Sequence, residues 1–125
     1  ATGGDESTFV DGAGTWYKAH TFANDGTFTV RWASDPSPIP VNEFFELDVI
    51  VMKDGRIFDG TTLQVDAAMP QHQHGMNHRP HVEQVGPGRW HVKDMLFHMP
   101  GEWVLYFDVV QGDVLRRAQE QVEVD

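Results

Sequence analysis

Histidine and methionine are concentrated in one short segment of the chain, residues 69–81, whose sequence is MPQHQHGMNHRPH. The segment holds four of the seven His and two of the five Met, and it contains no Asp, Glu or Lys. A second fragment, residues 98–101, reads HMPG and brings the same two residue types together again. Imidazole nitrogen and thioether sulfur, without carboxylate or thiolate, form a ligand set that favours copper, and the thioether favours Cu(I) in particular.

These two kinds of ligand suit a carrier of copper. Cu(I) is a soft ion that accepts thioether sulfur and imidazole nitrogen. A thioether has no proton to lose, so Met ligands keep binding under conditions where His begins to protonate. Cu(II) would prefer more nitrogen, which His72, His74, His78 and His81 could offer. A mixed site that serves both oxidation states is therefore an open alternative.

The strands expected beside these motifs place two Met residues at strand ends. Apolar residues alternate along residues 63–69, which makes Met69 the last core-facing residue, immediately before a Pro. A second strand over about residues 89–99 ends in the same way at Met99. If both strands end at one edge of a sandwich, the two Met converge there and the loop 71–80 folds over them. The candidate metal ligands are therefore Met69, His72, His74, Met76, His98 and Met99.

His98 requires a local irregularity to join this site. It lies on the opposite face of a regular strand from Met99, so a twist or bulge at the strand end must redirect it. The apolar residues at 90–92 alternate out of phase with those at 95–97. One extra residue near 93–94 would bring both halves onto one face, so the pattern predicts a β-bulge there.

Period-two alternation of apolar and polar residues runs through most of the chain and predicts an all-β protein. The clearest alternating segments are residues 28–32, 45–51, 63–69 and 103–109. Turn signals rich in Gly, Asn, Asp and Pro separate them, at 24–26, 53–55, 86–88, 100–101 and 111–113. The Pro-rich stretch 35–40 reads as an extended connection, and residues 115–121 could form a short helix although Val122 and Val124 favour a last strand. We predict an immunoglobulin-like antiparallel β-sandwich of about seven strands.

Length and composition narrow the class of protein. The 125 residues suit one domain; we assign residues 15–125 to the sandwich and the small, polar residues 1–14 to a flexible tether. The formal net charge of −10 disfavours nucleic acid and anionic membrane surfaces as partners. The absence of Cys excludes disulfides, thiolate zinc sites and blue-copper centres. No apolar run approaches the ~20 residues of a membrane span, and no signal peptide is visible, so we expect a mature chain without a span of its own.

The chain resembles the YtkA-like domain family, which is related to FixH-type copper and oxidase accessory proteins. The resemblance rests on Met69-Pro70-x-His72-x-His74-Gly75-Met76-x-x-x-Pro80, on Gly88-x-Trp90, on Phe97-x-Met99-x-Gly101-x-Trp103 and, upstream, on Pro40-Val41-Asn42-Glu43-x-Phe45. It covers most of the chain from about Trp16 onward, and the His/Met motif is its most specific part. It implies an immunoglobulin-like sandwich, a periplasmic or otherwise extracytoplasmic location, and an association with copper handling or oxidase assembly.

Together these observations predict an extracytoplasmic protein that carries or buffers Cu(I) and delivers it to a partner protein. One alternative is a copper-dependent redox enzyme, which would need an open coordination position and a substrate cleft; the sequence marks no acid or base beside the motif. Another is a zinc- or nickel-binding module, or an interaction module without metal. Zinc would favour the four His of residues 69–81 and ignore the Met residues.

Overall fold

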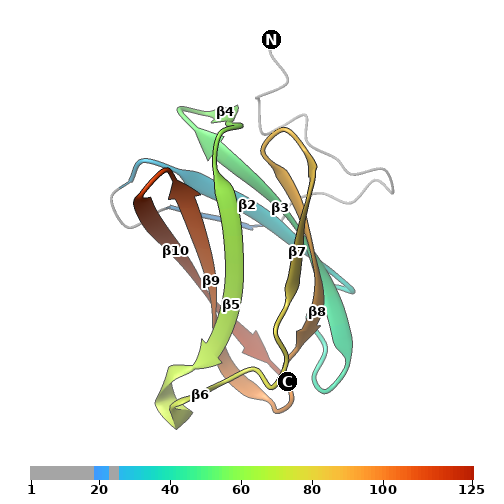
Figure 1. The fold of residues 1–125 in the computed structure, drawn as a ribbon. Helices are drawn as coiled ribbons and strands as arrows, with labels where there is room; N and C mark the ends of the chain where they lie inside the picture. Colours follow the sequence, from blue (N-terminus) through green and yellow to red (C-terminus); the bar gives the residue numbers. More distant parts are fainter. Residues whose placement is uncertain (1–18, 23–25) are drawn as a thin grey trace.

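The computed structural model describes residues 19–22 and 26–125, which form two antiparallel β-sheets packed face to face (Figure 1). The first sheet runs in the order β1 (Ala19–Phe22), β2 (Thr29–Asp35), β3 (Phe44–Lys53), β8 (Arg89–Leu96) and β7 (His81–Gly86), with β4 (Arg56–Ile57) paired to β3. The second runs β10 (Val114–Val124), β9 (Gly101–Gln111), β5 (Thr62–Met69) and β6 (His74–Gly75).

The arrangement confirms the predicted sandwich. Apart from the short strands β1, β4 and β6, seven strands remain among the described residues. Their order, β2-β3-β8-β7 facing β10-β9-β5, is that of a constant-type immunoglobulin sandwich. The three short strands lengthen the edges of the two sheets and leave this order unchanged.

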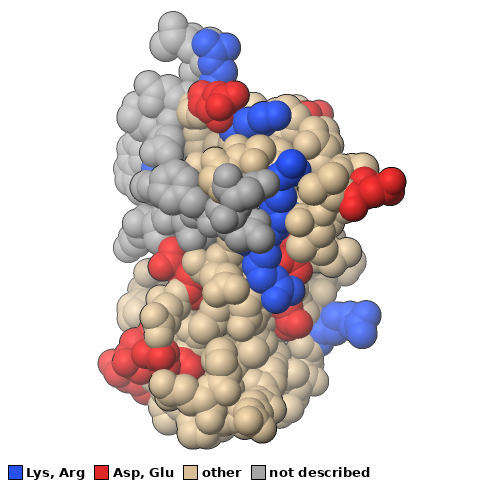
Figure 2. All heavy atoms as spheres, turned by 90° about the vertical axis from the view of Figure 1, so that its left-hand side faces the viewer, with Lys and Arg blue, Asp and Glu red and all other residues tan. Residues whose placement is uncertain are grey.

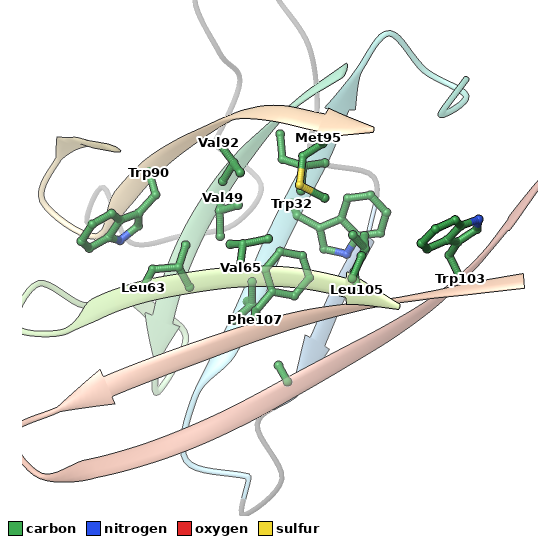
Figure 3. Close-up of a cluster of buried hydrophobic side chains, with 14 of the residues drawn as sticks. Trp32, Val49, Leu63, Val65, Trp90, Val92, Met95, Trp103, Leu105 and Phe107 are labelled. Atoms are coloured by element: carbon green, nitrogen blue, oxygen red, sulfur yellow. The ribbon is translucent and has the colours of Figure 1, made fainter. Parts of the chain in front are cut away.

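The core lies between the sheets and is built from the alternating residues of both. Val49 of the first sheet and Leu105 and Phe107 of the second are completely buried. Figure 3 shows these side chains meeting between the layers, with Trp90 at one end of the cluster and Trp103 at the other. The end that holds Trp103 is the end at which β5 stops and β9 begins.

A β-bulge in β8 keeps the apolar side chains of that strand on one face. Phe45 of β3 lies opposite Met95, but Leu47 lies opposite Val92, so two residues of β8 face one residue of β3. Asp94 adopts a left-handed conformation within the bulge, with φ of 64°. The apolar residues before and after it therefore both face the core, which confirms the predicted extra residue near 93–94.

Several segments refine the expectations from the sequence. Residues 36–43 contain no strand, as predicted for the Pro-rich connection, and residues 115–121 belong to β10 rather than to a helix. β8 ends at Leu96, earlier than the expected end at Met99. β7 was not expected from the alternation, because only two of its six residues, Val82 and Val85, are large and apolar.

The predicted tether, residues 1–14, lies outside the described residues, as does most of the expected turn at 24–26. In the described part of the chain, no helix has the length and apolar character needed to cross a lipid bilayer.

Candidate functional site

A tight hairpin at the end of β5 positions the first half of the His/Met motif. Pro70 ends the strand and begins a single turn of 3-10 helix, Pro70–His72. Gln73 follows in a left-handed conformation, with φ of 56°, and its backbone N–H donates to the carbonyl of Pro70 at 3.2 Å. The chain then pairs back on itself, so that His74 of β6 lies opposite Met69 of β5. The expected open loop is therefore a hairpin that brings these two candidate ligands together.

Met69 lies at the meeting point of β5 and β9. Its side chain is almost fully buried, with a relative exposure of 1%. Gly101, the first residue of β9, has φ of 133°, and a Cβ atom added to it would stand 2.6 Å from the Met69 Cε atom. The Met69 methyl group therefore lies beside Gly101, which is two residues after Met99 in the sequence. The two motifs therefore meet at one end of the sandwich, at the bottom of Figure 1, where β6 and the C-terminus lie.

Three imidazole rings form a row at this end. The ring centroids of His72 and His74 are 5.8 Å apart, and those of His74 and His98 are 5.3 Å apart. His98 reaches the row because β8 has already ended at Leu96, so its side chain is not held to the alternation of a regular strand. The expected irregularity at the strand end thus takes the form of an early stop in addition to the bulge.

The two more buried rings of the row, which we call the inner imidazoles, each have a nitrogen atom without a hydrogen-bond partner in the described part of the chain. His74 and His98 are half-buried, whereas His72 is exposed. The Nδ1 atoms of His74 and His98 are buried, and neither has a hydrogen-bond partner among the described residues. A buried nitrogen without a partner is costly, and native structures contain few of them. A metal ion bound through these lone pairs would satisfy both nitrogens at once.

Trp103 forms the inner wall of the site. The indole is fully buried, and its N–H donates to the Met99 carbonyl oxygen at 3.0 Å. It stacks on Phe97 with a centroid separation of 4.3 Å. The imidazoles of His74 and His98 both stand nearly perpendicular to it, at interplanar angles of 74° and 82°. No signal in the sequence distinguishes this Trp from Trp90.

The remaining candidate residues lie around this cluster in different ways. Met99 is half-buried and packs against the edge of the core. Met76 also packs against the core, but it lines a groove of about 690 Å³ with residues of β5 and β7. His78 is exposed and packs edge-on against Phe44, 5.0 Å between centroids, and His81 is exposed at the start of β7.

The four loop His are divided between two places in the fold. His72 and His74 stand next to each other, whereas His78 and His81 belong to a separate part of the loop and to β7. Within residues 19–22 and 26–125, no group of three or more His, Asp or Glu side chains is placed to hold one metal ion. The fold instead brings the rings of the two half-buried His together and places Met69 opposite one of them, His74, in the strand pairing.

A separate cluster of one His and two carboxylates lies on the outer face of the first sheet. His91 of β8 contacts Asp48 through Nδ1 at 2.8 Å and Glu46 through Nε2 at 2.5 Å. Burial of the ring lowers the pKa of His91, but the hydrogen bonds and negative charges of Asp48 and Glu46 outweigh that effect and raise it above 6.5. No sequence pattern predicts this cluster, because it depends on the register between β3 and β8.

Comparisons with known proteins support the fold assignment. No protein-family model matches the chain, and no curated protein matches it. Among solved structures, the chain is similar to a DUF4426 family protein from Pseudomonas aeruginosa PAO1, with 10% sequence identity and a TM-score of 0.59. The match covers 86% of this chain and 96% of that protein. At this identity the similarity shows that the two proteins share a fold.

Proposed function

We propose that this protein binds Cu(I) at the end of the sandwich where β5, β6 and β9 meet, and that it carries or buffers the ion for delivery to a partner protein. The observation that carries the proposal is the pair of buried, unpartnered Nδ1 atoms of His74 and His98, together with the buried Met69 that lies opposite His74 in the strand pairing. Imidazole nitrogen and thioether sulfur together are the ligands that a soft, monovalent copper ion accepts.

The ligands divide into an inner and an outer group. Met69 is buried and His74, His98 and Met99 are half-buried; together they form the inner group. His72 is exposed beside His74 and forms the outer group, where an ion would enter or leave. Met76 lines the neighbouring groove, so the proposal does not require it. A site with ligands at two depths suits a carrier, because the ion can pass from rim to interior by exchanging one ligand at a time.

The charge distribution supports selection by ligand chemistry rather than by charge. Figure 2 shows that, on the face it presents, Lys and Arg follow a stripe through the upper and middle parts of the molecule. The lower end, which carries β6 in Figure 1, is mostly uncharged there apart from a patch of Asp and Glu at one side. Neutral His and Met ligands in such surroundings favour a soft monovalent ion over hard divalent cations, which prefer carboxylates.

The location and the partner belong to the same proposal. The resemblance of the His/Met motif to the YtkA-like family supports an extracytoplasmic site of action and a copper-receiving protein as partner. The partner would approach the exposed rim at His72, because His72 is the exposed ring of the row and lies next to His74.

An anaerobic competition titration against a chromophoric Cu(I) chelator tests the proposal. The wild-type protein should withdraw one equivalent of Cu(I) from the chelator. The double variant His74→Ala/His98→Ala should lose more than about 100-fold in affinity, since even a residue that only orients a metal ligand is worth about 10- to 100-fold.

The chain offers a matched control. The double variant His78→Ala/His81→Ala removes the same number and type of side chains from the same loop and the strand after it, but it leaves the row of three imidazoles intact. It should bind Cu(I) as the wild type does. Equal losses in the two double variants, or a larger loss in the control, would place the metal elsewhere and refute the proposed site.

A further inference from the structure

Trp103 lies at the proposed copper site but is not one of the proposed ligands. The indole lies against both inner imidazoles, and its ring is fully buried at this end of the core (Figure 3). Two contacts fix its orientation: the stack on Phe97 and the hydrogen bond from its N–H to the Met99 carbonyl. Such a ring is pre-organised, so it keeps its position whether or not an ion is bound.

The three rings are close neighbours. The centroids of His74, His98 and Trp103 lie 5.3, 5.5 and 6.3 Å apart. A point equidistant from them is about 3.3 Å from each centroid, which suits an imidazole nitrogen that binds a metal roughly 2 Å away. The same point is well within the ~6 Å over which a cation is attracted to an indole face.

From this geometry we infer that Trp103 is a binding residue of the copper site, and that its indole stabilises bound Cu(I) by cation–π attraction. The inference rests on the proposed function. Phe97 covers one face of the indole, with the two rings parallel to within 3°, so the cation meets the opposite face. The ring is completely desolvated, which is the condition under which a cation–π contact is strongest, and Trp is the best of the aromatic residues for it.

The indole also gives the site a preference among metals. Cu(I) is satisfied by few ligands, so one side of the ion can rest against a ring that donates no lone pair. Zn(II) in a closed protein site takes four donor atoms in a tetrahedron, and the indole would occupy one of those positions without supplying a donor. Trp103 therefore favours Cu(I) over Zn(II) at the same pair of imidazoles.

Two measurements on the full chain test the role of Trp103. In the competition titration, Trp103→Phe and Trp103→Leu should weaken Cu(I) binding by roughly threefold to thirtyfold, with the larger loss for Leu, and should leave Zn(II) binding unchanged or improved. In fluorescence, Cu(I) should quench wild-type Trp emission, and Trp103→Phe should abolish that quenching. The Phe variant retains a ring to stack on Phe97, so thermal unfolding should show that it folds.

Trp90→Phe is the matched control, because Trp90 is buried at the opposite end of the same core (Figure 3). It should retain both the Cu(I) affinity and the quenching. Undiminished quenching in Trp103→Phe, or equal Cu(I) affinity in wild type and Trp103→Leu, would overturn the inference while leaving the proposed function in place. A wild-type protein that takes no Cu(I) from the chelator would instead remove the proposed function itself. If Trp103→Phe does not fold, the fluorine NMR signal of Trp103 in fluorotryptophan-labelled wild-type protein must shift on Cu(I) addition, or the inference fails.

Discussion

Met69 is both a core residue and a ligand of the proposed copper site. It is the last residue of β5, it is almost fully buried, and its methyl group lies against Gly101. A buried Met at a strand end is by itself an ordinary core residue, since the flexible thioether fills irregular gaps. The neighbouring imidazoles of His74 and His98 are what turn its sulfur into a candidate ligand.

We predict that Met69→Leu weakens Cu(I) binding while it leaves the fold nearly intact. The swap nearly conserves side-chain volume and should cost less than about 1.5 kcal/mol in the free energy of unfolding, but it removes the sulfur. Met52→Leu is the control, because Met52 is equally buried in a separate cluster with Ile50 and Ile57. Chelator competition and chemical unfolding measure the two effects. If both variants bind Cu(I) like the wild type, Met69 is a packing residue only.

His91 should make the stability of the protein depend on pH. Its folded pKa is raised, because the hydrogen bonds and charges of Asp48 and Glu46 outweigh the burial of the ring, which acts in the opposite direction. The resulting stabilisation is therefore complete below the unfolded value of about 6.5 and is lost as the pH rises through the folded pKa. Glu83 of β7 lies opposite His91 in the register, so the charges around the ring are negative on both neighbouring strands.

Urea unfolding of the wild type and of His91→Gln, from about pH 5 to about pH 9, measures this contribution. The wild type should be the more stable protein at the acidic end, by about 1 kcal/mol at most for such a partly exposed cluster, and the difference should shrink as the pH rises. Asp48→Asn should lose part of the pH dependence of the wild type, because Glu46 still contacts the ring. A difference between wild type and His91→Gln that stays constant with pH would contradict the raised pKa.

At the scale of the elements, the site depends on how β5 and β9 approach each other. The first residue of β9 must be a Gly for two reasons: its φ of 133° is unfavourable for other residues, and a Cβ atom would collide with the Met69 methyl at 2.6 Å. The position of the buried thioether is thus set by the backbone of the neighbouring strand.

We predict that Gly101→Ala destabilises the fold and weakens Cu(I) binding together. Gly112→Ala is the matched control, because Gly112 also has a positive φ, 61°, but no atom lies within 4 Å of its would-be Cβ. The control should lose about 1 to 2 kcal/mol from backbone strain alone and keep its Cu(I) affinity. Gly101→Ala should lose more stability and should bind Cu(I) less tightly. Thermal unfolding measures the stability, and chelator competition measures the Cu(I) affinity. If the two variants have equal stability and equal Cu(I) affinity, the Met69 side chain can move away from the new Cβ atom without affecting the fold or the site.

The bulge of β8 shows how one residue can organise a whole strand. Without it, the apolar residues on one side of Asp94 would face solvent, because a shift of one residue reverses the face of every side chain that follows. The bulge could be predicted from the sequence, since the break in alternation at residues 93–94 is visible in the letters alone. The register between β3 and β8 could not be predicted from the sequence. The contacts of His91 depend on that register, so they could not be predicted either.

For the whole molecule, sequence patterns within single strands predict the sandwich fold. They also predict the end of the sandwich at which the two His/Met motifs meet. Alternation marked the core-facing residues, and Pro70 marked the end of β5. The position of His74 was not predictable, because it depends on the left-handed conformation of Gln73, which turns the chain back into a two-residue strand. The proposed role of Trp103 is not predictable for a similar reason: Phe97 and His98 are near it in the sequence, but its other imidazole partner, His74, comes from a distant segment.

X-ray absorption at the copper edge of the Cu(I)-loaded protein tests the mixed nitrogen and sulfur site most directly. The spectrum of the wild type should contain both sulfur and imidazole scattering from the nearest neighbours of the ion, because Met69 and the His74–His98 pair lie together at one end of the core. The sulfur contribution should fall in Met69→Leu and disappear when Met99→Leu is added, while the imidazole contribution remains. A copper ion surrounded only by nitrogen and oxygen in the wild type would contradict a Cu(I) site built from these His and Met residues.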